Sequence, residues 1–197
     1  MNHTSFSPHK FPRARGARAN PPPHTPRTQL NHARVQKQAA IELKATIALV
    51  PAGDRTSPAY LAVHPFGKLP AAQTPEGQPI FESGAILLYL NDACGGAAST
   101  PSTRAAVASW VLWSNASLWP EVEKRRAVPP PMLAGLEGVL SRQPFLLGAA
   151  FSVADVAVAS YLHYATAFFG ARYTGAVARY VAAATARPAF RATISAE

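Results

Sequence analysis

The chain has 197 residues, a formal net charge of +9 and a sequence pI of about 10.2. The basic excess lies in residues 1–41, which carry seven Lys or Arg and no acidic residue, so we expect a nearly neutral folded part and no nucleic-acid partner. A single cysteine, Cys94, excludes an internal disulfide framework and fits a reducing, cytoplasmic location, and no apolar run reaches the roughly 20 residues that cross a bilayer.

Residues 1–26 are rich in Pro, Arg, His, Ser and Asn and have few large apolar side chains. Such a segment cannot bury enough surface to offset its ordering entropy, so we expect a disordered basic tail. Its composition also suits an organelle transit peptide. An ordinary tail and a wrongly joined start of the gene are equally open interpretations.

The next residues predict a small mixed unit. Residues 30–43 hold apolar side chains among helix-forming residues, which predicts a helix. Residues 44–51 (KATIALVP) are apolar and partly β-branched, which predicts a strand. Residues 57–61 predict one short helical turn.

The stretch HPFGKLPAAQTPEGQPIFESGAILLYL, residues 64–90, predicts a turn, two strands joined by a hairpin, and a helix. Pro70 cannot donate to a strand ladder, so we expect an interrupted strand or a cis bond before it. Ser83 is well placed as the N-cap of the helix that follows. A helix that starts directly after a strand presents free N–H groups to a carboxylate or phosphate.

Residues 93–101 form a Gly-, Ala- and Ser-rich linker, so we predict the domain boundary there. Cys94 lies in this linker with no base nearby in the sequence. From residue 102 onward the chain predicts helices: we expect Pro120 to kink or end the first of them, and prolines 129–131 to break the chain again. Ser152 and Asp155 form a capping box at the start of a long buried helix.

These motifs resemble the cytosolic glutathione transferases. The N-terminal half of that family carries the pattern seen here as HPFGKLPA, a hairpin and FESGAILLYL, and its helical half carries the pattern seen here as FLLGAAFSVADVAVAS. The resemblance runs from about residue 35 to residue 194. It implies an α+β/α two-domain fold, with a thioredoxin-like domain at residues 27–92 and an all-helical domain at residues 102–197. The first strand of the thioredoxin-like domain is missing or degraded.

The resemblance also implies the site residues. Leu69, before Pro70, pairs its backbone with the cysteinyl part of glutathione, and Glu82 with Ser83 holds the γ-glutamyl group. Lys68 lies near the glycyl carboxylate. The second substrate, a small hydrophobic electrophile, packs between the domains. The residues that the first helix of the helical domain offers it are Trp110, Trp113 and Asn115.

The catalytic residue is the weak point of the resemblance. In the family a Tyr, Ser or Cys after the first strand stabilises the glutathione thiolate. No Tyr or Cys occurs in the first 41 residues, and prolines 21–23 make a poor central strand. Thr28 and Gln29 are the nearest hydroxyl and amide, and we name them as weak candidates.

Two functions follow from this reading. The first is an enzyme that binds glutathione as co-substrate, without a metal, and transfers it to an electrophile, as a homodimer away from membranes. The second is a non-catalytic interaction module of the same fold, as in elongation factor gamma subunits. An inactive, truncated family member is the third possibility.

Overall fold

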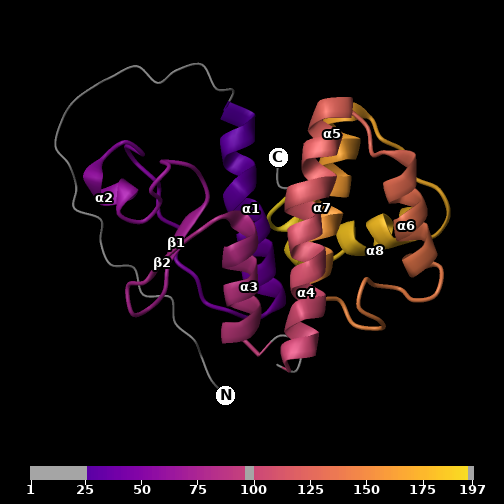
Figure 1. The fold of residues 1–197 in the computed structure, drawn as a ribbon, viewed down its shortest axis with the longest axis horizontal. Helices are drawn as coiled ribbons and strands as arrows, with labels where there is room; N and C mark the ends of the chain where they lie inside the picture. Colours follow the sequence, from indigo (N-terminus) through magenta and orange to yellow (C-terminus); the bar gives the residue numbers. More distant parts are fainter. Residues whose placement is uncertain (1–25, 96–99, 195–197) are drawn as a thin grey trace.

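The computed structural model describes residues 26–95 and 100–194, with the side chains of the first helix described from residue 33 onward. The predicted tail lies outside this part except for residue 26. Two halves lie side by side (Figure 1). The first half contains α1 (Pro26–Glu42), α2 (Pro58–Leu61), β1 (Ala71–Gln73), β2 (Pro79–Phe81) and α3 (Ser83–Ala93). The second contains α4 (Pro101–Trp113), the π-helix η1 (Ser114–Leu118), α5 (Trp119–Arg125), α6 (Pro130–Leu140), α7 (Val153–Phe169), α8 (Gly175–Thr185) and α9 (Pro188–Arg191).

Of the strand predicted for residues 44–51, the structure shows a single β-bridge residue, Thr46. The described residues of this stretch form no continuous strand, and the one sheet described consists of β1 and β2. Leu49 and Val50 are about half exposed, at 54% and 49%. A β-branched run becomes a strand only when a neighbouring ladder pairs its backbone and covers its side chains, and the described residues supply no such neighbour here.

The predicted hairpin is confirmed. β1 and β2 are antiparallel, with Ala71 opposite Phe81 and Gln73 opposite Pro79. The turn closes through the Thr74 N–H, which donates to the Gln78 carbonyl at 2.9 Å. Gly77 has a φ of 85°, a conformation that glycine adopts without a side-chain clash.

The helical half agrees with the sequence except around Pro120. Pro120 lies inside α5 and neither ends a helix nor interrupts the helical path, which continues from α4 through η1. Proline has no N–H and its ring clashes with the carbonyl four residues earlier. Here the helix widens into a π-turn at residues 114–118, directly before the proline, which relieves this conflict.

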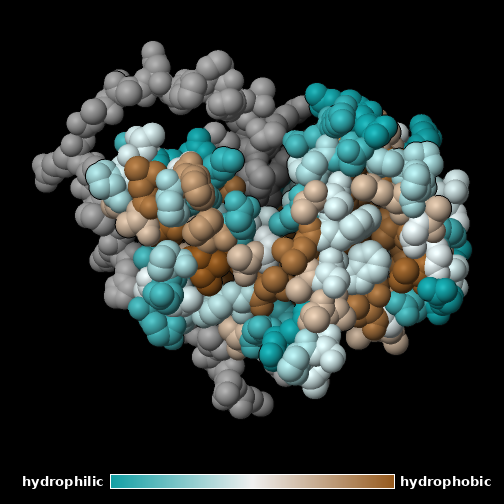
Figure 2. Space-filling view, viewed as in Figure 1, coloured by the Kyte–Doolittle hydropathy of each residue, from teal (hydrophilic) through white to brown (hydrophobic). Residues whose placement is uncertain are grey.

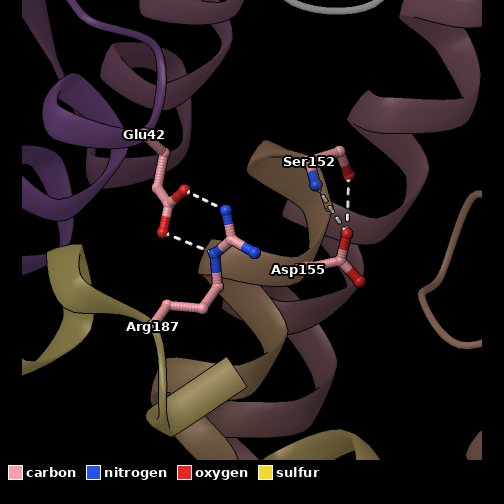
Figure 3. A network of polar contacts seen from close by, with 4 residues as sticks. All are labelled: Glu42, Ser152, Asp155 and Arg187. Atoms are coloured by element: carbon pink, nitrogen blue, oxygen red, sulfur yellow. Dashed lines mark hydrogen bonds and ion pairs between the residues drawn. The ribbon is translucent and has the colours of Figure 1, made fainter. Parts of the chain in front are cut away.

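The long helix α7 begins where the capping box predicts. The Asp155 carboxylate accepts hydrogen bonds from the Ser152 N–H and hydroxyl, both at 2.8 Å, and from the Leu146 N–H at 2.9 Å. Burial raises the pKa of Asp155, while these hydrogen bonds act in the opposite direction. The two residues thus have a structural role, joining the turn before α7 to its first turn (Figure 3).

The two halves share a buried apolar cluster. Its members come from α1, α3, α4 and α7 and include Ala39, Ile86, Leu87, Leu90, Val107, Val111, Val153 and Val156. At one edge of this contact Arg187, before α9, donates to Glu42, at the end of α1, over 2.7 and 2.6 Å (Figure 3). The Arg187 guanidinium also lies 4.1 Å from the centre of the Phe151 ring. The halves therefore pack through a continuous core.

Candidate functional site

The hairpin register brings the two predicted glutathione-binding pairs together. Because Ala71 lies opposite Phe81 in an antiparallel pair, the preceding Leu69–Pro70 and the following Glu82–Ser83 leave the hairpin at the same end. The Leu69–Pro70 peptide bond is cis. Pro70 is buried, Leu69 is half-buried and Lys68 is exposed.

A tyrosine fastens the loop that carries Lys68. The Tyr60 hydroxyl donates to the Lys68 carbonyl at 2.6 Å, and Tyr60 itself is only 4% exposed. Tyr60 belongs to α2, which is capped by the Ser57 hydroxyl. The loop thus has a fixed anchor, while the Lys68 side chain stays in solvent.

Ser83 does not have the N-cap role that the sequence predicts. The N-cap of α3 is Glu82, and Ser83 is the first residue of the helix. Glu82 is exposed and has a φ of 71°, in the left-handed region that non-glycine residues rarely adopt. Such a conformation costs on the order of 1–3 kcal/mol and clusters at ligand sites. An exposed carboxylate thus stands beside the free N–H groups of the α3 N-terminus.

The helical half reaches Ser83 through Asn115. The Asn115 Nδ2 donates to the Ser83 hydroxyl at 2.9 Å, and the Tyr161 hydroxyl donates to Asn115 Oδ1 at 2.9 Å. Asn115 lies in η1 and Tyr161 in α7. Burial raises the pKa of Tyr161 to about 12, so its phenol stays protonated at neutral pH.

A glutamine of α1 also contacts this helix start. The Gln36 Nε2 donates to the Ser83 carbonyl at 3.4 Å, while Gln36 is 5% exposed and its Oε1 has no hydrogen-bond partner among the described residues. The sequence prediction missed Gln36 and Tyr161. The only signal for Gln36 was a polar side chain between the apolar positions Val35 and Ala39.

The two predicted tryptophans pack on the helical core. Trp110 and Trp113 are half-buried against the main cluster of that half, with ring centres 5.6 Å apart at nearly right angles. Leu112 between them is 56% exposed, and apolar residues appear along α4 on the face shown in Figure 2. A role for these tryptophans in a second-substrate pocket stays a prediction, as does that of Asn115, whose amide faces Ser83.

The weak catalytic candidates lie at the start of α1. Thr28 and Gln29 belong to its first turns, and their side chains are outside the described part of the structure. Among the described residues no group of three His, Cys, Asp or Glu is arranged to hold a metal ion. None of the helices described has the length and apolar character that crossing a membrane requires.

The family model for the glutathione S-transferase N-terminal domain matches residues 23–93, and the one for the C-terminal domain matches residues 130–192. Together they cover about two thirds of the chain. The chain belongs to the glutathione S-transferase family.

Solved glutathione transferases share its fold. One from Burkholderia graminis, crystallised with two glutathione molecules per subunit, superposes with a TM-score of 0.68 at 21% identity over 85% of each chain. A theta class enzyme from Xanthomonas axonopodis pv. citri, with glutathione bound, gives 0.67 at 22% identity over 85% of this chain and 93% of that one. At these identities the similarity establishes the two-domain glutathione transferase fold.

The curated relatives match only part of this chain and part of their own length. Elongation factor 1-gamma of Carassius auratus is 34% identical over 121 residues, 52% of this chain and 27% of that protein. The disulfide-bond oxidoreductase YfcG of Escherichia coli (strain K12) is 29% identical over 130 residues, 53% of this chain and 60% of that protein. The matches thus span about a quarter of the first protein and three fifths of the second.

Proposed function

We propose that this glutathione transferase family member binds glutathione at the hairpin end and transfers it to a small electrophilic compound. The observation that carries the proposal is the meeting of Leu69–Pro70 with Glu82–Ser83 at the N-terminus of α3. Crystallised relatives of the same fold hold glutathione, which supports the ligand.

Each group has a chemical counterpart in glutathione. The free N–H groups and positive end of α3, with the Ser83 hydroxyl, suit the α-carboxylate of the γ-glutamyl residue. The exposed Glu82 carboxylate suits its ammonium group. The backbone N–H and C=O of Leu69 suit the cysteinyl peptide unit, and the Lys68 ammonium suits the glycyl carboxylate.

The transfer step needs a thiolate, since the thiol is a poor nucleophile. The glutathione sulfur would form a bond to an electrophilic carbon, whose leaving group departs with the electron pair. We propose the first turns of α1, with Thr28 and Gln29, as the region that stabilises this thiolate. The aromatic face of α4 with Trp110 and Trp113 is the proposed wall for the electrophile. A cytoplasmic homodimer is proposed with it.

A second candidate is a glutathione transferase fold used for protein interaction. The similarity to elongation factor 1-gamma favours it, because that match is the higher in identity of the two relatives described above. The absence of Tyr and Cys from residues 1–41 favours it too. In this case the site would hold glutathione weakly or not at all.

Calorimetry decides between the two. We expect wild type to bind glutathione in the micromolar to millimolar range and Ser83→Ala to weaken this binding strongly. Ser109→Ala is the matched control, because its exposed hydroxyl donates only to the Ala105 carbonyl of its own helix. Conjugation of a chlorodinitrobenzene should then fall in Thr28→Ala or Gln29→Ala. A folded wild type that binds no glutathione would rule out the enzyme and leave the interaction module.

A further inference from the structure

We propose that Asn115 and Tyr161 of the helical half orient the Ser83 hydroxyl so that its proton points at the ligand carboxylate. This inference rests on the proposed function, because the carboxylate is that of the γ-glutamyl group. It makes the two residues positioning residues: they act on glutathione through Ser83 and need no contact of their own with the ligand.

The direction of the hydrogen bonds carries the argument. Tyr161 donates its only proton to Asn115 Oδ1, at 2.9 Å. The Asn115 amide nitrogen, which can only donate, therefore faces the Ser83 oxygen, also at 2.9 Å. Ser83 must accept this bond, so its own proton is left for another partner. A carboxylate at the α3 N-terminus is the acceptor that this arrangement suits.

The opposite orientation of the amide would change the partners of Tyr161. With Oδ1 toward Ser83, the Asn115 nitrogen would face Tyr161, and the phenol proton would be left with the neighbouring Ser83 hydroxyl as its acceptor. Tyr161 is half-buried and its ring stacks on Trp119, with centres 5.0 Å apart and planes 17° apart. The orientation in the structure leaves the Ser83 proton for a ligand, whereas the opposite one would direct that proton at Asn115 Oδ1.

Two features of this chain bring Asn115 within reach of Ser83. The π-turn at residues 114–118, which precedes Pro120, changes the direction in which Asn115 leaves the helix. Gly84, next to Ser83, leaves room for the amide: a Cβ atom there would lie 2.9 Å from Asn115 Nδ2 and 3.2 Å from Val111 Cγ1. π-turns within helices occur frequently at functional sites.

The variants test the direction of the hydrogen bond between Asn115 and Ser83 as well as its presence. Asn115→Ala should weaken glutathione binding about tenfold, the order of one hydrogen bond to a charged group. Asn115→Asp should weaken it further, because its carboxylate takes the Ser83 proton and turns the oxygen lone pairs toward the ligand. Gly84→Ala should weaken binding by displacing the Asn115 amide, although alanine favours the helix.

A double-mutant cycle separates positioning from structure. If Asn115 acts through Ser83, the S83A/N115A protein should bind glutathione no more weakly than Ser83→Ala alone. Tyr161→Phe should weaken binding about threefold, less than one full hydrogen bond to a charge. Tyr173→Phe is its control: that hydroxyl donates to the Leu162 carbonyl at 2.8 Å, away from Ser83, and its loss should leave the affinity unchanged.

The outcomes are distinct. Losses that multiply in S83A/N115A, or an Asn115→Asp variant that binds as well as wild type, would overturn the positioning proposal while leaving glutathione binding in place. A wild type that binds no glutathione would overturn both. Loss in Asn115→Ala, greater loss in Asn115→Asp and no added loss in the double variant would support it.

Discussion

Arg187 provides the clearest test of how the two halves are held together. Its guanidinium makes two hydrogen bonds to Glu42, at 2.7 and 2.6 Å, and lies over the Phe151 ring. The side chains are 35% and 13% exposed, so the pair is neither buried nor fully solvated. Removing Arg187 leaves a largely shielded carboxylate at the end of α1.

The magnitude follows from these contacts. A pair of charge-assisted hydrogen bonds contributes about 1.5–3 kcal/mol, and we take the lower end because Arg187 is partly in solvent. The ring contact adds about 0.5–1 kcal/mol. Arg187→Ala should therefore lower the free energy of unfolding by about 2 kcal/mol, which for a chain of this size is about 4–8 °C in melting temperature.

The assay is urea unfolding, monitored by tryptophan fluorescence. All three tryptophans lie in the helical half. The single variants Arg187→Ala and Glu42→Ala and the double variant complete a cycle, and the coupling should be about 1.5 kcal/mol. Arg142→Ala, at an exposed arginine after α6, is the control and should change stability little. A coupling below about 0.5 kcal/mol, the range of an exposed pair, would refute this account.

Three further predictions concern stability. The carboxylate of Glu137 accepts hydrogen bonds from the N–H groups at the start of α8, which lowers its pKa from the ordinary value of a glutamate. Its contribution to stability is present above that ordinary value and is lost as the pH falls through the lowered one. The melting temperature of wild type should thus fall toward that of Glu137→Gln on acidification, and a gap that stays constant would contradict the role. Asp155→Asn should cost about 2 kcal/mol in urea unfolding, because an amide nitrogen then faces an N–H donor; a neutral effect would disprove the capping role. Leu87→Ala, in the core shared by both halves, should cost about 3 kcal/mol, and separate transitions by fluorescence and circular dichroism would argue against one continuous core.

The hairpin and the capping box could be predicted because their information is local. A turn with Gly77 between two short apolar runs, and Ser152 three residues before Asp155, specify contacts within a few residues. The helix after the hairpin was also predicted, but its first residue was shifted by one. The left-handed conformation of Glu82 moves the N-cap from Ser83 to Glu82, and nothing in the residue type indicates it.

The strand at residues 44–51 shows the opposite case. Its β-branched composition expresses a preference, but a strand exists only with a neighbour, and pairing depends on segments far away in the chain. The contact of Asn115 with Ser83 likewise joins residues that are far apart along the chain. The two residues are 32 positions apart, and nothing in the sequence indicated that Asn115 contacts Ser83.

The sequence by itself therefore determined the family, the hairpin, the helical half and the residues that meet at the end of β1 and β2. Turn chemistry, capping and apolar periodicity act over a few residues, so they can be read in order along the chain. Only the tertiary structure decided that a π-turn and Gly84 bring Asn115 to Ser83, with Tyr161 behind it. Hydrogen-bond direction depends on which atoms face each other after the two halves pack, and the shared core fixes how they pack.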